Sequence, residues 1–340
     1  MATATEARTQ IQRIDVHCHG FPEGVLKQWA AAYPDNFRLE RRRGSSALVA
    51  IWAGVPLPAW IVEERLAAIE RDQVALEILS APTPVYAQAD DNTTALCEEM
   101  NAFQADVASQ HPTRFRSFIH LPIHDLEATR VALRRWKDHP MTAGIVLGSN
   151  VGGIYPGDAS LLPVWEEIAA SRLAVFIHPL TPCGSVGPIP AVIFHFVNDT
   201  AVAAATMIYS GLLDRFPELT IILAHYGGSM PYHLRRLDRI SHPHFPKSRG
   251  QDLPRSPSQY ANRFYVDTAQ GFHRPSFELA RAVFGIERLL YGSDYFLLDT
   301  PFRSELNAFF ETLPLSDGER EDIFRRNARR LLRGISDLLT

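Results

Sequence analysis

The sequence predicts a (β/α)8 barrel (a TIM barrel), a closed ring of eight parallel strands surrounded by helices, as one domain over residues 1–340. Strand-like segments alternate with helix-like segments along the chain, which is the order that a parallel sheet requires. Several strand-like segments are continuously apolar, as expected of strands buried on both faces. A chain of 340 residues, 46% of them hydrophobic, is long enough for one large core. The alternative is a doubly wound open sheet, which shows the same alternation.

The eight expected strands are short, rich in apolar residues, and end at a proline, a glycine or a polar residue. In chain order they are Arg13–His17, Val74–Ser80, Phe115–His120, Ala143–Gly148, Leu173–Pro179, Leu219–His225, Arg263–Thr268 and Arg288–Asp294. The strands of a parallel barrel all point the same way, so the residues that follow them collect at one end. We therefore expect the active site among those residues.

Helices are expected where apolar residues recur three or four positions apart between charged ones. These segments are Trp60–Gln73, Asp91–His111, Leu126–Trp136, Leu161–Ser171, Asn198–Phe216, Met230–Ile240, Ser276–Phe284 and, closing the chain, Phe302–Thr312 and Asp317–Leu338. Asn92 or Thr93 is the expected N-cap of the second helix.

Two stretches lack a sustained pattern and are expected to form loops above the strand ends. Residues 20–60 are rich in Pro, Gly, Trp and Arg, and we interpret them as a long insertion or lid that carries specificity. Thr181–Pro190 is a second loop of this kind. Residues 1–12 are polar and are expected to be a flexible N-terminus.

The composition is that of an ordinary globular protein. A net charge of −4 gives no reason to expect a nucleic-acid partner, and we interpret Arg41–Arg43 as a solvated loop. The three cysteines, Cys18, Cys97 and Cys183, are too few for a disulfide framework and favour a reducing compartment. The sequence shows no signal peptide and no apolar run approaching the ~18 residues of a membrane span. We therefore expect a cytoplasmic protein without a membrane partner.

Histidine and aspartate recur at the carboxyl ends of the expected strands. His17 and His19 follow the first strand and share one face, because side chains two positions apart point the same way. His178, His225 and Asp294 end the fifth, sixth and eighth strands. Side chains of this kind that converge at the mouth of a barrel predict a divalent metal site, with Zn²⁺ favoured and Mn²⁺, Fe²⁺ or Co²⁺ as alternatives. No organic cofactor is expected.

Four motifs resemble the amidohydrolase superfamily, and more narrowly its decarboxylase branch of aminocarboxymuconate semialdehyde, 6-methylsalicylate, γ-resorcylate and 5-carboxyvanillate decarboxylases. The motifs are His17-x-His19, Phe176-Ile177-His178-Pro179, Leu223-Ala224-His225-Tyr226-Gly227-Gly228 and Tyr291-Gly292-Ser293-Asp294-Tyr295. The resemblance implies metal ligands at His17, His19, His178 and Asp294, with His225 as a catalytic residue. It also implies a homodimer in which Arg236 lies near the partner subunit's active site.

Two departures from the branch bear on the substrate. Many relatives have Glu-Thr-x-Arg where this chain has Asp199-Thr200-Ala201-Val202, so the arginine is absent. Some relatives place a carboxylate-binding arginine in the loop after the first strand, where only Arg41–Arg43 are candidates. The sequence therefore leaves open which acid is used.

Lysine content separates two types of metal centre in this superfamily. Binuclear hydrolases place a carbamylated lysine at the end of the fourth strand, but Lys27, Lys137 and Lys247 are the only lysines and none lies there. A single metal ion is therefore expected, and with it a non-oxidative decarboxylase (a carboxy-lyase) of a small salicylate-type or unsaturated carboxylic acid. His225 is the expected acid/base, with Asp294 as ligand and possible proton relay. The alternative is a mononuclear hydrolase or hydratase of a lactone or related cyclic carboxylate.

Substrate-binding residues are predicted more weakly. Phe21, Trp52, Trp60 and Tyr86 offer aromatic surface for a ring, although core or lid packing explains each of them too. His120 and His273 follow the third and seventh strands and are candidates to reach the pocket, and Arg236 is carried over from the resemblance. Cys18 should point away from the metal, because it lies between the two ligands of the first strand.

Overall fold

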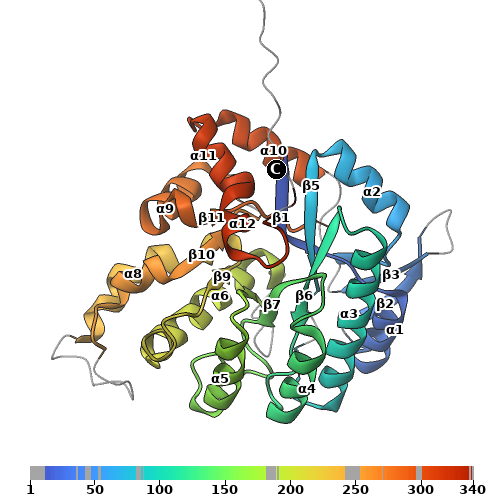
Figure 1. Ribbon diagram of the computed structural model, residues 1–340, viewed down its shortest axis with the longest axis horizontal. Helices are drawn as coiled ribbons and strands as arrows, with labels where there is room; N and C mark the ends of the chain where they lie inside the picture. Colours follow the sequence, from blue (N-terminus) through green and yellow to red (C-terminus); the bar gives the residue numbers. More distant parts are fainter. Residues whose placement is uncertain are drawn as a thin grey trace, which may run out of the picture.

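The computed structural model contains an eight-stranded parallel sheet that closes into a barrel with helices on its outside (Figure 1). It describes residues 12–35, 37–42, 47–52, 55–81, 86, 88–180, 189, 191–241, 253–269, 271–295, 301–336 and 338. The strand order is β1-β5-β6-β7-β8-β9-β10-β11. Closure comes from the backbone N–H groups of Val16 and His19, which donate to the carbonyls of Tyr291 and Tyr295 at 3.0 Å each. The predicted (β/α)8 barrel is confirmed.

All eight predicted strands are present, although several are shorter than expected. They are β1 (Arg13–His19), β5 (Val74–Ser80), β6 (Phe115–His120), β7 (Thr142–Gly148), β8 (Val175–His178), β9 (Ile221–Leu223), β10 (Phe264–Asp267) and β11 (Leu289–Leu290). Beyond β9 and β11 the chain turns through left-handed residues, with φ of 56° at both His225 and Asp294. These two turns lie at the site described below.

The barrel helices agree with the sequence pattern except around the fifth strand. They are α2 (Val62–Arg71), α3 (Asp91–Gln110), α4 (Leu126–Trp136), α5 (Leu162–Ser171), α6 (Ala191–Tyr209), α7 (Leu212–Arg215), α8 (Met230–Leu237) and α9 (Arg274–Phe284). Helix α6 begins seven residues before the predicted start and is separated from α7 at Gly211, whose φ is 75°. The N-cap of α3 is Asp90, which accepts from the backbone N–H of Thr93 at 2.9 Å, so the predicted caps were wrong by two or three positions. At the C-terminus lie α10 (Pro301–Thr312), α11 (Asp317–Glu321) and α12 (Asn327–Leu331).

The insertion after β1 is regular, contrary to the prediction of an unpatterned lid. It contains α1 (Glu23–Ala32) and an antiparallel sheet of β2 (Phe37–Arg41), β3 (Leu48–Trp52) and β4 (Val55–Pro58). Its strands are only four or five residues long, too short for alternation to stand out in the sequence. Of the arginine triplet, Arg41 ends β2, Arg42 pairs with Glu64 at 2.6 Å, and Arg43 lies outside the described residues. The predicted Thr181–Pro190 loop and residues 1–11 also lie almost wholly outside them.

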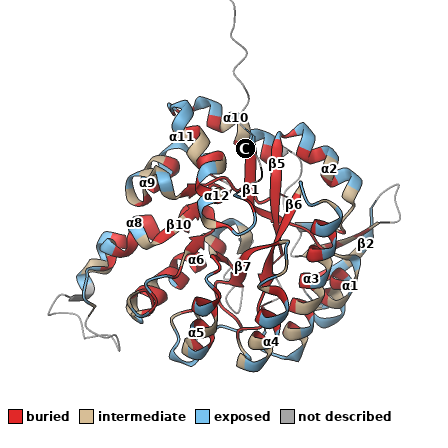
Figure 2. Cartoon of the chain, viewed as in Figure 1, coloured by how far each residue is buried: buried red, intermediate tan, exposed pale blue. Residues whose placement is uncertain are grey.

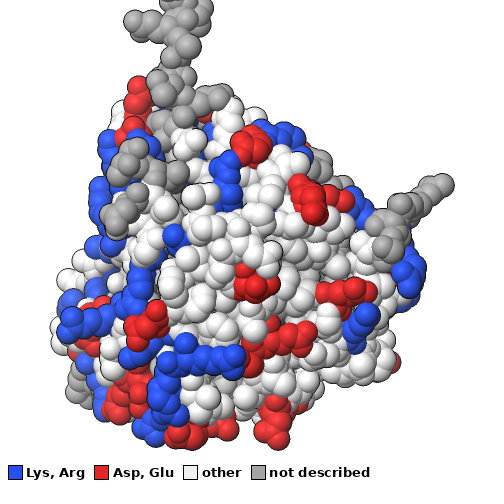
Figure 3. Space-filling view, turned by 45° about the vertical axis from the view of Figure 1, so that its right-hand side comes forward, with Lys and Arg blue, Asp and Glu red and all other residues white. Residues whose placement is uncertain are grey.

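Buried side chains line both faces of the barrel strands (Figure 2). One apolar cluster takes residues from strands all round the ring, among them Ile14, Ile78, Phe118 and Phe176, and none from α2 to α9. It therefore fills the inside of the barrel. On the face turned forward in Figure 3, basic and acidic side chains are interspersed.

Helix α6 is, among the described residues, the one helix long and apolar enough by composition to cross a membrane. Its mean hydropathy is 1.5 over a window that is 44% buried. Helices that pack on the core of a globular domain share this length and composition.

Candidate metal centre

Four side chains meet at the carboxyl ends of the strands: His17 and His19 of β1, His178 of β8 and Asp294 after β11. One ligand atom of each lies within 4.8 Å of the ligand atoms of the other three, and all four residues are buried. These are the residues that the sequence analysis named as ligands, and the fold brings them together although the first and last are far apart in the chain.

The outer nitrogen of each histidine is held by a second group, which points the other nitrogen toward the centre. Nδ1 of His17 lies 2.8 Å from Asp267 Oδ2. Nδ1 of His19 donates to the Ser80 carbonyl at 3.1 Å, and Nδ1 of His178 to the Pro179 carbonyl at 2.8 Å. Metal-binding histidines are oriented in this way, because the outer hydrogen bond fixes both tautomer and ring direction.

The inner atoms fit a single divalent cation. His17 Nε2 lies 3.2 Å from Asp294 Oδ1 but makes no hydrogen bond to it, and His19 Nε2 lies 3.0 Å from the same oxygen. Three imidazole nitrogens and one carboxylate form a donor set that suits borderline divalent metals. β7, the fourth strand of the barrel, where binuclear relatives were expected to carry a bridging lysine, ends at Leu147 and Gly148, which offer no side-chain ligand. The cluster is therefore a site for one divalent metal.

The charges of the centre are strongly coupled. Burial alone would raise the pKa of Asp294, but the imidazoles of His17, His19 and His225 hold it well below its usual range. Burial would likewise lower the pKa of His17, but the carboxylates of Asp267 and Asp294 raise it to about 10. The carboxylates thus attract positive charge to this point, which a bound metal supplies as well as a proton does.

His225 lies beside the four ligands. Its Nε2 is 3.3 Å from Asp294 Oδ2, and its backbone N–H donates to Asp267 Oδ1 at 2.9 Å. Nδ1 is buried and has no hydrogen-bond partner among the described residues. His225, Tyr226 and Asp294 all have φ of 56°, a left-handed conformation that non-glycine residues rarely adopt. Such backbone conformations cluster at active sites, where the surrounding structure enforces them.

The sequence analysis missed Asp267, which orients both His17 and His225. It is fully buried, and its two oxygens accept from a ligand ring and from the backbone of the acid/base candidate. The signal was present, because Asp267 ends the seventh strand just as the named residues end theirs.

A buried ion-pair network behind the ligands was also missed. Arg303 of α10 contacts Asp15 of β1 at 2.9 Å and Glu77 of β5 at 2.5 Å. It also donates to Ser293 Oγ at 3.2 Å, and Ser293 in turn donates to Asp15 at 2.5 Å. Ser293 precedes Asp294, and Asp15 lies two residues before His17, so the network grips two ligand-bearing segments. The sequence gives no sign that Arg303 reaches this network, because Arg303 lies on α10, far along the chain from β1.

The predicted substrate residues are placed differently from one another. Phe21 is buried and stacks on His19 at a centroid distance of 6.2 Å. His120 is buried with both ring nitrogens engaged, because Nε2 accepts from Ala81 N–H at 3.1 Å and Nδ1 lies 3.3 Å from Asn101 Oδ1. These contacts favour an anchoring role for His120 over the predicted contact with substrate. Arg236 is exposed on α8 and is not among the residues that line the pocket beside His225.

Aromatic side chains connect the insertion to the centre. They form a series of neighbouring rings, and the centroids of successive rings lie 5.3 to 6.2 Å apart. The chain runs from His19 through Phe21, Trp29, Phe37, Trp52 and Phe196 to His178. The insertion thus walls one side of the centre with aromatic surface. Tyr86, by contrast, is fully buried and donates to the Val146 carbonyl at 2.9 Å, so it belongs to the core.

Comparison with known proteins agrees with this geometry. The family model described as amidohydrolase matches residues 14–334. The chain is 28% identical over 299 residues to a γ-resorcylate decarboxylase of Polaromonas sp. (strain JS666), covering 80% of this chain and 87% of that one. It is 30% identical over 250 residues to the 2-amino-3-carboxymuconate-6-semialdehyde decarboxylase of Dictyostelium discoideum, covering 69% of this chain and 67% of that one.

A solved structure extends the likeness to the fold. A dihydroxybenzoic acid decarboxylase from Polaromonas sp. JS666, crystallised with manganese and the inhibitor 2-nitroresorcinol, superposes with a TM-score of 0.74 at 24% identity. The match covers 95% of this chain and 97% of that one.

Proposed function

The chain belongs to the amidohydrolase family, and from this premise we propose that it is a metal-dependent, non-oxidative decarboxylase of a small salicylate-type or unsaturated carboxylic acid. The observation that carries the proposal is the single-ion His/Asp centre with His225 at its edge. The relatives named above are decarboxylases, and at least one of them acts on an ortho-hydroxylated aromatic acid by its name.

The residues of the site support a protonation-first reaction. The ion held by His17, His19, His178 and Asp294 would supply Lewis acidity toward the carboxylate and the neighbouring hydroxyl oxygen of the substrate. His225 donates a proton to the ring carbon that bears the carboxylate, so a C–H bond forms. The C–C bond then breaks, CO2 leaves, and its bonding electron pair restores the aromatic ring. Asp294 Oδ2, 3.3 Å from His225 Nε2, is placed to relay the replacement proton.

We propose Zn²⁺ as the resident ion and Mn²⁺ as the alternative to be tested. Three imidazoles and one carboxylate suit Zn²⁺, and the same nitrogen and oxygen ligands are also accepted by Mn²⁺. The relative crystallised with manganese makes the comparison of the two metals worthwhile.

We also propose a homodimer and a cytoplasmic location. Helix α6 exposes Phe194 (54%) and Val202 (43%), large apolar side chains that a second copy would cover. In such a dimer the exposed Arg236 would approach the other subunit. Cys18 and Cys97 are free and buried, which suits a reducing compartment, and Cys183 lies outside the described residues.

The test is CO2 release, with ultraviolet absorbance, from a panel of 2-hydroxybenzoates by protein loaded with Zn²⁺ or Mn²⁺. The expected result is stoichiometric CO2 and the corresponding phenol. Opening of lactones without CO2 would instead establish the alternative, a mononuclear hydrolase. No turnover of the 2-hydroxybenzoates or of the lactones at full metal occupancy would exclude both reactions for the compounds tested.

A further inference from the structure

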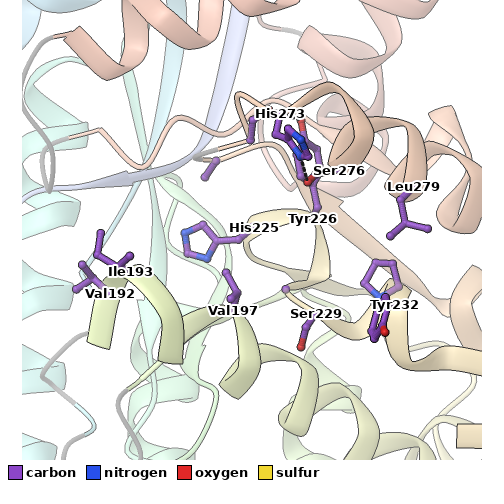
Figure 4. A pocket seen from close by; sticks show the side chains of 14 residues that line it. Val192, Ile193, Val197, His225, Tyr226, Ser229, Tyr232, His273, Ser276 and Leu279 are labelled. Carbon is purple, nitrogen blue, oxygen red and sulfur yellow. Dashed lines mark hydrogen bonds between the residues drawn. The ribbon is translucent and has the colours of Figure 1, made fainter. Parts of the chain in front are cut away.

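A pocket of about 400 Å³ opens beside His225 (Figure 4). Its walls come from the first turns of α6, the turn after β9, the start of α8, and the segment from β10 into α9. None of the four metal ligands lines it, so His225 is the residue shared by the centre and the pocket. A volume of this size holds a substituted aromatic ring or a part of one.

Among the described residues, the wall of this pocket carries no lysine, arginine, aspartate or glutamate. Its two serine hydroxyls are already engaged within the protein. Ser276 Oγ lies 2.9 Å from His273 Nδ1, and Ser229 Oγ donates to Asn198 Oδ1 at 3.0 Å. A carboxylate entering here would lose part of its hydration and meet no lysine or arginine of the described wall, which is unfavourable.

The rim is apolar and exposed. Ile193 of α6 is 62% exposed, Tyr232 of α8 is 79% exposed, and Leu279 of α9 is 41% exposed. Val192 and Ile193 stand on the α6 side of the pocket, facing Tyr232 and Leu279 across it (Figure 4). An apolar group seated between them would remove this surface from water, which stabilises the complex.

We propose that this pocket receives an uncharged, apolar substituent of the substrate, so that the preferred acid has one carboxylate and an alkyl or aryl group rather than a second carboxylate. The inference rests on the proposed decarboxylase function and narrows its substrate class. The carboxylate goes to the metal side of His225, and the substituent to the pocket side. The binding energy of the substituent then holds the reacting carbon against His225.

The first experiment compares 2-hydroxybenzoates that carry methyl, ethyl or propyl groups, or a second carboxylate, at each free ring position. For at least one position, kcat/KM should rise about two- to fourfold per added carbon. The second carboxylate at that position should lower kcat/KM by about 10²-fold relative to the alkyl compound. Calorimetric binding of the corresponding phenols should follow the same order, which gives a readout independent of turnover.

A pair of variants places a cation either at the rim of the pocket or on an exposed helix position outside it. Ile193→Arg puts a positive charge at the rim, and it should raise kcat/KM for the dicarboxylate at least about tenfold while lowering it for the propyl compound. Val131→Arg, on α4 and outside the pocket, changes an exposed apolar side chain (52%) in the same way, and as the control it should leave the ranking of substrates unchanged.

The outcomes separate the two proposals. If no compound releases CO2, the decarboxylase function fails and this inference falls with it. If CO2 is released but the parent protein prefers the dicarboxylate, the inference alone is overturned. Loss of that preference in Arg236→Met would then assign carboxylate binding to Arg236 of a second copy.

Discussion

The metal centre and the pocket beside His225 share one histidine but differ in almost every physical respect. Around the centre, buried charges are abundant, and each is held by a partner, as Asp267 is by His17 and Asp15 is by Arg303. The described wall of the pocket carries no lysine, arginine, aspartate or glutamate, and its rim is exposed.

This difference indicates that the metal centre carries out the chemistry and the pocket selects the substrate. Buried charge is costly unless it is fully paired, so a network of that kind persists where geometry must be held. An uncharged pocket imposes little geometry and selects by size and polarity. Chemistry is therefore expected to fail when the first region is altered, and substrate choice to shift when the second is.

The largest expected effect comes from removing a ligand. His178→Ala deletes one of the three imidazoles and should reduce both bound metal and kcat/KM, the latter by at least about 10³-fold, because several kcal/mol of charge stabilisation is lost. Metal content by atomic emission, measured beside activity, checks both. A variant that keeps a full metal equivalent and normal turnover would remove His178 from the centre.

His225→Asn should separate chemistry from metal binding. The variant removes the proton donor but none of the four ligands, so turnover should fall by about 10²–10⁴-fold while metal content stays near that of the parent. The measurement is metal analysis with steady-state kinetics on the best substrate of the panel. Loss of the metal together with activity would show that His225 is itself a ligand. His225 would then belong to the metal centre rather than to the boundary between centre and pocket.

The two regions also differ in how far the sequence predicts them. Each proposed ligand lies at the carboxyl end of a barrel strand or just beyond it, so one topological rule and the residue types place His17, His178 and Asp294 together. The same rule covers Asp267, which was overlooked. Arg303 obeys no such rule, because its contacts with Asp15 and Glu77 depend on where α10 packs.

The pocket wall and the short strands of the insertion could not be predicted from the sequence, for a related reason. Val192 and Ile193 lie in a segment that the pattern left outside any helix, so the wall that they form could not be foreseen. The strands from Phe37 to Pro58 are too short for their alternation to be distinguished from a loop. Long regular elements are set by local pattern, whereas these features depend on tertiary packing.

Arg303→Met tests whether the buried network supports the centre. It leaves Asp15 without its buried cation and Glu77 with Arg65 alone, so the free energy of unfolding should fall by about 3–5 kcal/mol. Zinc affinity should weaken by about 10- to 100-fold, because Ser293 beside Asp294 loses its anchor. Urea unfolding and competition with a chelator measure the two effects.

The matched control for that variant is Arg135→Met, which removes an exposed pair with Glu98 at 2.7 Å. It should cost below about 1 kcal/mol and leave zinc affinity unchanged. Equal losses in the two variants would mean that burial of the Arg303 network does not matter. Arg303→Lys should recover part of the zinc affinity if charge is the main requirement.

The smallest expected effect is a pH dependence of the free energy of unfolding that comes from His120, which lies near the metal centre and not in the pocket. Burial, together with the nearby His19, lowers the pKa of His120 from 6.5 to about 3. The unfolded chain therefore binds this proton more readily than the folded one between these two values. The stabilising contribution of the neutral ring is complete above about pH 6.5 and is lost as the pH falls toward 3, by about 2 kcal/mol between about pH 7.5 and about pH 5.

His120→Gln should be less stable at about pH 7.5, where it loses the Ala81 and Asn101 contacts, yet should lose less stability on acidification than the parent. Urea unfolding of both proteins at the two pH values measures the difference. An unchanged slope would mean that His120 accepts a proton inside the folded barrel, and its ring would then be available to the substrate after all.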